Sequence, residues 1–546
     1  MPTVTLNKTE FEKLVGKELP LEQLKDRISM LGTDLEGIEG EEIKVEIFPN
    51  RPDLLSEQGF ARAFSSFIGV KTGLREYNVE SSGMKVIVDS SVTMRPFTAC
   101  AIVKGLSFTD EKIREIMQIQ EKLATTHGRN RKKSAYGIYP AKKIKFPIRY
   151  IAKNPKDVLF KPLGFDEEVT ADEIIETHPK GKTYKNITEG WEKYPFFIDA
   201  EDNVMCMLPF TNSEDTGKVE LDTTEVFVEC TGTDLQNVMV ALNIIVTTLA
   251  DMGGKIYSVD IEYPDQKITT PNLKPPEMEI DLNLINKLLG LELKEKDAKD
   301  LLEKMGYGYE SGKVKIPAYR ADILHQVDLA EDIAIAYGYE NFIEEIPNVA
   351  TIGKENPLEK FMEKIRDILI GLQLIEVKNF HLTTKEDLTE KIHCKEEPIS
   401  LQNAIGEHNH LRNKIFSSLL KNLQENQHHE YPQNIFEIGR IFESGKTETG
   451  VVETENLAIA LCHDKVDFTQ IKQILDVVAK SLGLTVSIKE TEHPSFIRGR
   501  VGKIFMNNIP IGLIGEIHPE VLGLWTIQVP IAILEINLEK LFSFLV

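Results

Sequence analysis

The sequence predicts an α+β multidomain protein that contains two copies of one small domain. Residues 14–32 read LVGKELPLEQLKDRISMLG and residues 288–306 read LLGLELKEKDAKDLLEKMG, with glycines at matching positions and equal spacing. Further along, FPNRPDLL at 48–55 corresponds to IPAYRADIL at 316–324. Two copies are too few for a solenoid. We therefore expect a duplicated domain of helix-turn-helix type, in which an extended segment and a further helix follow the helix pair.

The region between the copies, residues 86–265, is predicted to be a mixed α/β domain. Short apolar runs predict strands, and longer runs with helical periodicity predict amphipathic helices. The strands are expected at 85–88, 99–103, 204–208 and 226–230, and the helices at 110–125 and 234–251. The first copy is assigned to residues 1–85 and the second to 268–346, which starts with the Pro-rich linker 268–277.

Residues 356–546 are predicted to form a domain with an antiparallel sheet. Helices are expected at 358–371 and 470–482, and strands at 375–382, 434–444, 457–463 and 531–536. The pair Asn507-Asn508 is typical of a tight hairpin turn. Strands joined by hairpins, with few helices between them, favour an α+β arrangement.

Length and composition exclude several classes of protein. A chain of 546 residues is long enough for three or four domains. A net charge of −22 excludes nucleic-acid binding over the whole surface, so any such contact is local. Five scattered cysteines without a CxxC pair are typical of reduced thiols. No apolar stretch is long enough for a membrane span and no signal pattern is present, so we expect a soluble cytoplasmic protein.

Four acids lie close together in the second copy: Asp322, Asp328, Glu331 and Asp332. On a helix the last three share one face, where carboxylates repel one another unless a cation lies among them. Hard oxygen ligands of this kind suit Mg²⁺. The alternative is a solvated acidic first turn that complements the helix dipole. The first copy keeps only Asp53 and has Gly59, Arg62 and Ala63 at the other positions, which favours the metal, because a fold that needed these acids would need them twice.

Residues 128–149, GRNRKKSAYGIYPAKKIKFPIR, form a basic run in an otherwise acidic chain. Lys and Arg are interleaved there with Tyr136, Tyr139 and Phe146. This pattern is typical of a surface that contacts phosphates and stacks bases, and a solvated basic loop is the alternative. The helix-turn-helix patterns do not predict DNA binding, since such patterns are common as plain structural units.

Six stretches in order resemble the β subunit of phenylalanine–tRNA ligase in its archaeal and eukaryotic form, and together they extend over nearly the whole chain. They are IFPNRPDLLSEQGFARAF (47–64), FVECTGTD (227–234), the segment 317–339, IFEIGRIF (435–442), HPSFIRGRVGKI (493–504) and IGEIHPEVL (514–522). The resemblance implies an α subunit as partner in an α₂β₂ tetramer, tRNA(Phe) as the RNA, ATP as a substrate of the complex, and Mg²⁺. It places the magnesium ligands on Asp322, Asp328, Glu331 and Asp332.

The resemblance also implies that residues 356–546 have a class II synthetase core that serves as a scaffold. A class II site needs one arginine in Phe-Arg-x-Glu and another in Gly-x-Gly-x-x-Arg, because guanidinium groups match phosphate oxygens. The corresponding segments here, 436–439 and 512–518, read FEIG and GLIGEIH and lack both arginines. No catalytic residue for adenylation is therefore assigned, and adenylation is expected in the α subunit.

Residues 86–265 resemble the family's editing module, which hydrolyses tyrosine mischarged onto the tRNA. A pocket that hydrogen-bonds the phenolic hydroxyl discriminates strongly against phenylalanine. Glu229 and Thr231 are the candidates for binding that hydroxyl, with Asn212 and Ser213 on a loop opposite to orient the ester or a water. The alternative is that Glu229 and Thr231 are ordinary strand residues. For the whole chain, the competing hypothesis is a non-enzymatic nucleic-acid-binding or assembly protein that reuses these domains.

Overall fold

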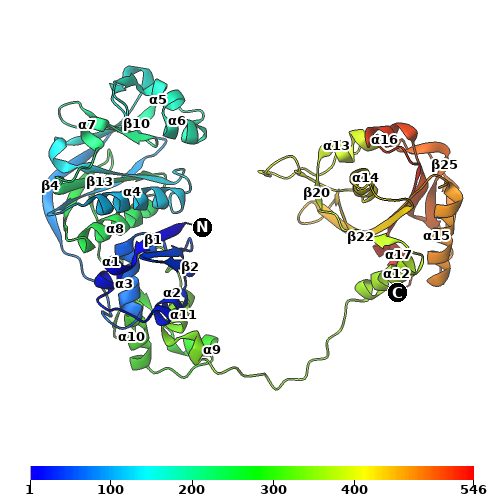
Figure 1. Cartoon of the computed structure of the whole chain (residues 1–546), viewed down its shortest axis with the longest axis horizontal. Helices are drawn as coiled ribbons and strands as arrows, with labels where there is room; N and C mark the ends of the chain where they lie inside the picture. The colour runs from blue at the N-terminus through cyan, green and yellow to red at the C-terminus, as the bar shows by residue number, and fades with distance from the viewer. Residues whose placement is uncertain (1, 546) are drawn as a thin grey trace. The chain divides into compact units, whose positions relative to one another are not determined.

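The computed structural model describes residues 2–545, and the chain divides into two compact units, Met1–Ile346 and Pro347–Val546 (Figure 1). Both units combine helices with sheets, so the prediction of a mixed α/β multidomain chain is confirmed at that level. The first unit contains the three segments that the sequence assigned to separate domains. Among the helices described in residues 2–545, none is long and apolar enough to cross a membrane.

The two repeated segments have the same order of elements. The first contains β1 (Thr3–Asn7), α1 (Lys8–Val15), α2 (Leu21–Met30), β2 (Asp34–Glu39), β3 (Glu42–Glu46) and α3 (Glu57–Phe67). The second contains β16 (Glu277–Glu279), α9 (Leu282–Leu289), α10 (Glu295–Lys304), β17 (Gly308–Glu310), β18 (Lys313–Lys315) and α11 (Gln326–Tyr337). Their strand orders, β1-β3-β2 and β16-β18-β17, also match. Each segment thus contains a three-stranded sheet in addition to its helix pair. The sequence predicted only one extended segment there.

The matching glycines end the first helix of each segment. Gly16 follows α1 with a φ of 83°, and Gly290 follows α9 with a φ of 68°. Their backbone N–H groups donate to the carbonyl oxygens of Glu12 and Asn286. Glycine adopts this left-handed conformation without a Cβ clash, which is why it recurs at helix ends.

Between the two segments lies a ten-stranded sheet. Its strand order is β12-β11-β10-β7-β4-β14-β5-β13-β6, and β15 pairs with β14. The strands are β4 (Val79–Val88), β5 (Phe97–Lys104), β6 (Ser134–Pro140), β7 (Ile148–Lys153), β10 (Tyr194–Ile198), β11 (Val204–Met207), β12 (Thr211–Asn212), β13 (Glu225–Gly232), β14 (Lys255–Glu262) and β15 (Lys267–Thr270). The associated helices are α4 (Asp110–Thr125) and α8 (Leu235–Asp251), and smaller elements are β8 (Leu159–Phe160), β9 (Val169–Thr170), α5 (Ala171–Thr177), α6 (Pro179–Tyr184) and α7 (Glu214–Gly217).

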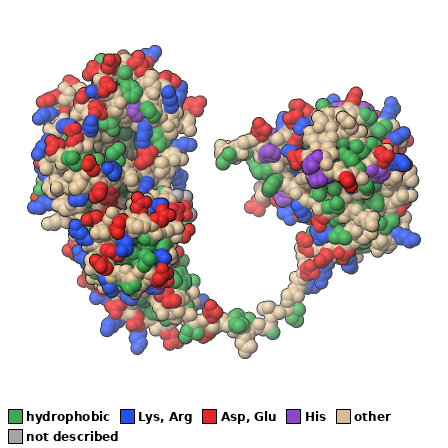
Figure 2. All heavy atoms as spheres, in the orientation of Figure 1, with side chains coloured by type: hydrophobic (Ala, Val, Ile, Leu, Met, Phe, Trp, Pro, Cys, Tyr) green, Lys and Arg blue, Asp and Glu red, His purple; other side chains and the backbone are tan. Residues whose placement is uncertain are grey.

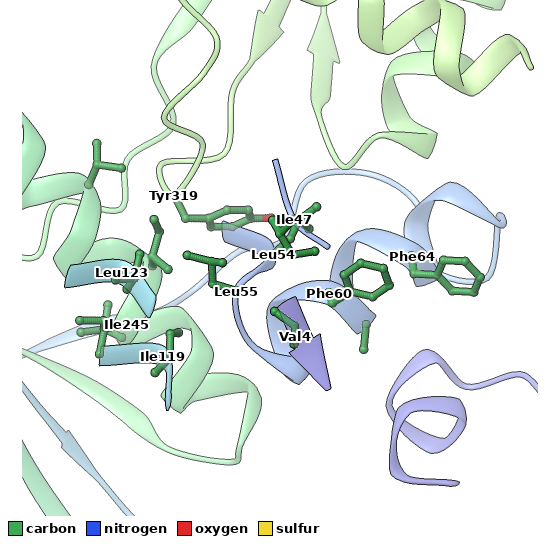
Figure 3. Close-up of a cluster of buried hydrophobic side chains, with 14 of the residues drawn as sticks. Val4, Ile47, Leu54, Leu55, Phe60, Phe64, Ile119, Leu123, Ile245 and Tyr319 are labelled. Atoms are coloured by element: carbon green, nitrogen blue, oxygen red, sulfur yellow. The ribbon is translucent and has the colours of Figure 1, made fainter. Parts of the chain in front are cut away.

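One continuous core joins both repeated segments to the helices of this sheet. Figure 3 shows Phe60 of α3 and Tyr319 of the second segment in one apolar cluster with Leu123 of α4 and Ile245 of α8. All of these side chains are buried. Because burial of apolar area is the main stabilising term in folding, the shared core explains why residues 1–346 form one unit.

The second unit is built on a seven-stranded sheet in the order β19-β22-β23-β27-β26-β25-β24. The strands are β19 (Ile375–Glu376), β22 (Gln433–Ser444), β23 (Val451–Cys462), β24 (Ser487–Glu490), β25 (Phe496–Met506), β26 (Ile509–Ile517) and β27 (Ile531–Asn537), and a separate pair is formed by β20 (Leu382–Thr383) and β21 (His410–Leu411). One apolar cluster includes side chains of α12 (Pro357–Gly371), α15 (Phe468–Ser481) and α17 (Leu538–Phe542). Another includes side chains of α14 (Phe416–Glu425) and α16 (Pro519–Leu524), near the short helix α13 (Lys385–Leu388).

Most of the predicted elements are confirmed, with one clear exception. Helix α4 has the predicted bounds, and the Asn507-Asn508 turn joins β25 to β26 with both residues in the left-handed conformation. The predicted strand at 375–382 is wrong, because β19 ends at Glu376 and β20 begins at Leu382. Beyond Val377, whose N–H still bonds the Phe436 carbonyl, Lys378 and Asn379 contact β22 through their side chains, at the Ile438 carbonyl and Glu437.

Candidate functional site

Strand β13 carries Glu229 and Thr231 on the same face of the large sheet. Glu229 pairs in register with Cys100 of β5 and Gly137 of β6. Alternate residues of a strand point to opposite faces. Val226, Val228 and Cys230 belong to the cluster that includes α4 and α8, and Phe227 belongs to a second cluster with Cys206 and Tyr150. Glu229 and Thr231 therefore share the face of Phe227, and both have 0 % exposed surface.

Glu229 is a buried acid whose pKa lies well above its ordinary value. Burial raises the pKa of Glu229 to about 8, although the Tyr139 hydrogen bond and the charges of Arg95 and Arg131 act in the opposite direction. The Tyr139 hydroxyl donates to Oε1 at 3.2 Å. Gly137 makes room for this contact, because a Cβ there would lie 2.6 Å from Glu229 Oε1 and 2.5 Å from the Tyr139 hydroxyl.

In the described part of the chain, two polar atoms of this pair have no hydrogen-bond partner. Among residues 2–545, neither Oε2 of Glu229 nor Oγ1 of Thr231 has a hydrogen-bond partner, although both atoms are buried. Buried polar atoms are nearly always paired, so each exception calls for an explanation such as a ligand or water. Since the two residues are neighbours on one strand face, these atoms are a candidate binding site for a group that both donates and accepts hydrogen bonds.

Asn212 reaches the same site from β12. The Tyr139 hydroxyl lies 3.0 Å from Asn212 Oδ1 and 3.2 Å from Glu229 Oε1, so its single proton serves two acceptors and Tyr139 links Asn212 to Glu229. Ser213 is buried beside it, but its Oγ caps α7 by accepting the backbone N–H of Asp215 at 3.3 Å. The structure thus brings Glu229 and Asn212 together through a residue that sequence reasoning did not select, and it gives Ser213 a structural bond.

Two further side chains hold the rim of the site. Arg95 has 0 % exposed surface, and its Nη2 donates to the Thr231 carbonyl at 2.9 Å. Arg131 donates from Nη1 to the carbonyls of Pro209 and Phe210, just before the Asn212 segment, at 2.8 and 3.1 Å. Sequence reasoning missed Arg95, and it named Tyr139 only as a stacking ring of the basic run and not as part of this site. A signal for Tyr139 exists: it lies two residues after Gly137 on the same strand face, where the missing side chain of glycine leaves room for its ring. No local pattern marks Arg95.

The four acids predicted to bind Mg²⁺ have three different environments in the structure: two pair with one arginine, one caps a helix and one is exposed. Asp322 gives both oxygens to Arg320, with distances of 2.8 Å from Nε and 2.7 Å from Nη2. Asp332 is buried on α11 and also pairs with Arg320, at 2.9 Å. Asp328 accepts the backbone N–H groups that precede α11, at 2.8 and 2.7 Å, and Glu331 is exposed.

In this arrangement the four acids do not fit a metal ion. Within the described residues, no group of three or more His, Cys, Asp or Glu side chains is placed to hold one. The cation among the carboxylates is the guanidinium of Arg320, and Asp328 acts as a helix cap. A Mg²⁺ ion would require Asp322 and Asp332 to release Arg320. The magnesium site therefore stays a prediction.

The first repeated segment contains the same arginine–aspartate pair without the additional acids. Arg51 donates to Asp53 at 2.9 Å from Nε and 2.8 Å from Nη2. Burial by itself would raise the pKa of Asp53, but Arg51, Arg320 and Arg62 together hold that pKa below its usual value. The Arg-x-Asp motif is thus a buried ion pair in both copies, so a structural role accounts for its repetition.

The basic run is divided between two places. Tyr139 is fully buried and Tyr136 bonds Ser134, so these rings do not form an exposed stacking surface. At one end of β6, Lys142 and Lys143 bond Thr224 and Glu220. At the other end, Arg129 and Lys132 are exposed and have no ion-pair partner within residues 2–545. A surface with interleaved aromatic rings, as predicted, is not what the structure contains.

The segments compared with class II motifs lie in the second unit. Glu437 on β22 has 0 % exposed surface, accepts from Arg412 Nη1 at 2.6 Å and from Asn379 Nδ2 at 2.7 Å. Arg412 therefore places a guanidinium beside this segment. That guanidinium is buried and bonded to Glu437, so it is not free to bind a phosphate. On β26, Glu516 pairs with Arg500 at 2.6 Å.

Comparisons with known proteins agree on one family. The model for the "Phenylalanyl tRNA synthetase beta chain CLM domain" matches residues 344–538, and that for the "tRNA synthetase B5 domain" matches residues 278–339. The chain is 42% identical over 558 residues to the phenylalanine–tRNA ligase beta subunit of Pyrococcus abyssi, with 100% of both chains covered. It is 43% identical to that of Pyrococcus furiosus, over 99% of this chain and 100% of the relative.

A solved structure is also similar. It is an N-terminal fragment of the phenylalanyl-tRNA synthetase beta-subunit from Pyrococcus horikoshii, with a TM-score of 0.59 and 42% identity, and the match covers 62% of this chain and 99% of the fragment. Similarity of this degree over the full length shows common descent and not only a shared fold. The chain belongs to the family of phenylalanine–tRNA ligase beta subunits.

Proposed function

We propose that the chain supports the ATP-dependent attachment of phenylalanine to tRNA(Phe) as the non-adenylating subunit of an α₂β₂ complex in the cytoplasm, with Mg²⁺ used by the complex. The observation that carries this proposal is full-length similarity to beta subunits. It also rests on the two degenerate class II segments, one of which contains the buried Glu437. We further propose that residues 1–85, 86–265, 268–346 and 356–546 are separate evolutionary domains, of which the last has a class II synthetase fold.

Reconstitution tests this role. The purified chain alone should not charge tRNA, and addition of an α subunit should produce charging. A chain that forms no complex with an α subunit, but binds nucleic acid by itself, would favour the non-enzymatic alternative.

We also propose that the face of β13 edits tRNA by hydrolysing tyrosine esters. Support comes from the two unpartnered atoms, Glu229 Oε2 and Thr231 Oγ1. A phenolic hydroxyl both donates and accepts hydrogen bonds, so it can pair with both atoms. Phenylalanine would leave them buried and unpaired, which is the basis of strong discrimination. Further support comes from Tyr139, whose own phenolic hydroxyl lies within hydrogen-bond distance of Asn212 Oδ1 and Glu229 Oε1.

The burial of this site has a consequence for binding. Since Glu229 and Thr231 have no exposed surface, a tyrosine ring reaches them only when covering side chains move. Tyr139 is the first candidate, because its hydroxyl already occupies Glu229 Oε1. Asn212, at the sheet edge and half-buried, remains next to the space that the ester would enter, where we assign it to orient the ester or a water.

Thr231→Val tests the site with little change in volume. The complex of parental chain and α subunit should hydrolyse tyrosine charged on tRNA(Phe), and the variant should lose one hydrogen bond, or about three- to tenfold in rate. Thr247→Val is the matched control, because Thr247 is equally buried and its hydroxyl bonds the Asn243 carbonyl within α8. Equal loss in both variants would contradict the assignment of Thr231.

A further inference from the structure

The turn between α4 and β6 has an unusual backbone. Arg129, Asn130 and Arg131 have φ values of 49°, 52° and 63°, so three consecutive residues other than glycine are left-handed. Stopping a helix requires only one such residue, commonly glycine. Strained backbone of this kind persists only where the surroundings hold it, and it concentrates at functional sites.

Hydrogen bonds to α4 and Arg95, and an ion pair with Glu121, hold the turn in place. The N–H groups of Asn130 and Arg131 donate to the carbonyls of Thr125 and Ala124 at the end of α4, at 3.1 and 2.8 Å. The buried Arg95 donates from Nη1 to the Arg131 carbonyl at 2.9 Å. Arg131 itself pairs with Glu121 at 2.9 Å. The turn is therefore a fixed feature and not a loose loop.

The same two arginines connect the turn to the candidate editing site. Arg95 bonds the Thr231 carbonyl, and Arg131 bonds the carbonyls of Pro209 and Phe210. Thr231 and the segment that leads to Asn212 are the two walls of that site. The turn thus lies at the rim, and its exposed cations, Arg129 and Lys132, have no ion-pair partner in the part of the chain that is described.

We propose that Arg129 and Lys132 bind backbone phosphates of the single-stranded 3′ end of a tRNA whose aminoacyl ester lies in the β13 site. This inference rests on the proposed editing function and adds the group that recognises the RNA. The chain is strongly acidic, and Figure 2 shows acidic side chains gathered over the β2–β3 hairpin, where Asp34, Glu36, Glu39, Glu41 and Glu42 are exposed. Two free cations on a fixed turn are a favourable local site for phosphates in such a surface.

The test compares three complexes formed with an α subunit: parent, Arg129→Gln/Lys132→Gln, and Lys142→Gln/Lys143→Gln. The control pair removes the same charge from the same basic run at the opposite end of β6, where both lysines already have partners. The measurement is kcat/KM for hydrolysis of tyrosine charged on tRNA, as a function of salt concentration. The slope of log(kcat/KM) against log[salt] is negative, and the loss of two phosphate contacts should make it shallower by about 1.4. Relative to the parent, kcat/KM of the variant should then be roughly 25-fold lower at 0.1 M salt than at 1 M salt. The control variant keeps the parental slope.

A parental slope in the Arg129→Gln/Lys132→Gln variant overturns the inference and leaves the editing proposal standing. If the parental complex hydrolyses no tyrosine ester, the editing proposal fails, and the turn is judged by photo-crosslinking instead. A tRNA with a photoreactive nucleotide next to its 3′ end should crosslink to residues 129–132. Crosslinks that map only elsewhere overturn the inference independently of activity.

Discussion

Replacement of Glu229 by Gln should remove a large pH dependence of stability. Gln keeps the size of the side chain and an oxygen for the Tyr139 hydroxyl, but it does not ionise. Burial raises the pKa of Glu229 from an ordinary 4.5 to about 8. Between these values the folded chain holds a proton at Glu229 that the unfolded chain has lost, so the parent becomes less stable as pH rises. The stabilising contribution is complete below pH 4.5 and is lost as pH passes 8.

The magnitude follows from the same linkage. At about 1.4 kcal/mol per pH unit, the parental free energy of unfolding should fall by about 3 to 4 kcal/mol between pH 5 and pH 8 relative to the Glu229→Gln variant. Other titrating groups are common to both chains and cancel in the difference. Trp191 and Trp525 are the two tryptophans, one in each unit, so a Trp525→Phe background makes Trp191 fluorescence report unfolding of residues 1–346 by urea.

Thr231→Val serves as the control for this measurement. It changes the neighbouring residue on the same strand face and leaves the ionisable group in place, so it should keep the parental pH profile. A Glu229→Gln variant whose unfolding free energy parallels the parent within about 0.5 kcal/mol across this range would refute the reasoning, since Glu229 would then titrate alike in both states.

Three further outcomes are expected. Glu229→Ala should remove one hydrogen bond to the tyrosine hydroxyl, about 1.5–3 kcal/mol, and slow hydrolysis of tyrosine-charged tRNA by roughly ten- to a hundredfold. Phenylalanine charging should stay near normal. A parental hydrolysis rate would exclude Glu229 from the site. Asp53→Asn should lower the unfolding free energy by about 3–5 kcal/mol in urea, with or without Mg²⁺, because it leaves the buried Arg51 without its carboxylate, whereas Asp322→Asn should cost less, since Arg320 keeps Asp332. A loss confined to Asp322→Asn in the presence of Mg²⁺ would establish the metal site instead. The chain without an α subunit should not exchange pyrophosphate into ATP with phenylalanine, and exchange by rigorously purified chain would contradict the scaffold role.

The local elements were predictable because their signals are local. Helix α4 has its predicted bounds since periodicity identifies its body and Thr109 caps its start. The repeat was visible because Gly16 and Gly290 serve the same left-handed helix ends. The strand predicted at 375–382 was wrong beyond Glu376, where Lys378 and Asn379 contact β22 through their side chains, with residues about sixty positions away that no window of sequence contains.

The sequence by itself determined the family, the class of fold, the two copies of the repeat and the position of Glu229 and Thr231 on one strand. Only the tertiary structure decided what those side chains meet. It placed the hydroxyl of Tyr139 next to Glu229 and the Arg95 guanidinium on the Thr231 carbonyl, and it paired Asp322 with Arg320 although the comparison of the two copies favoured Mg²⁺. The physical reason is that spacing along a helix or strand determines which side chains share a face, whereas the free energy of a buried charge depends on partners brought by other segments.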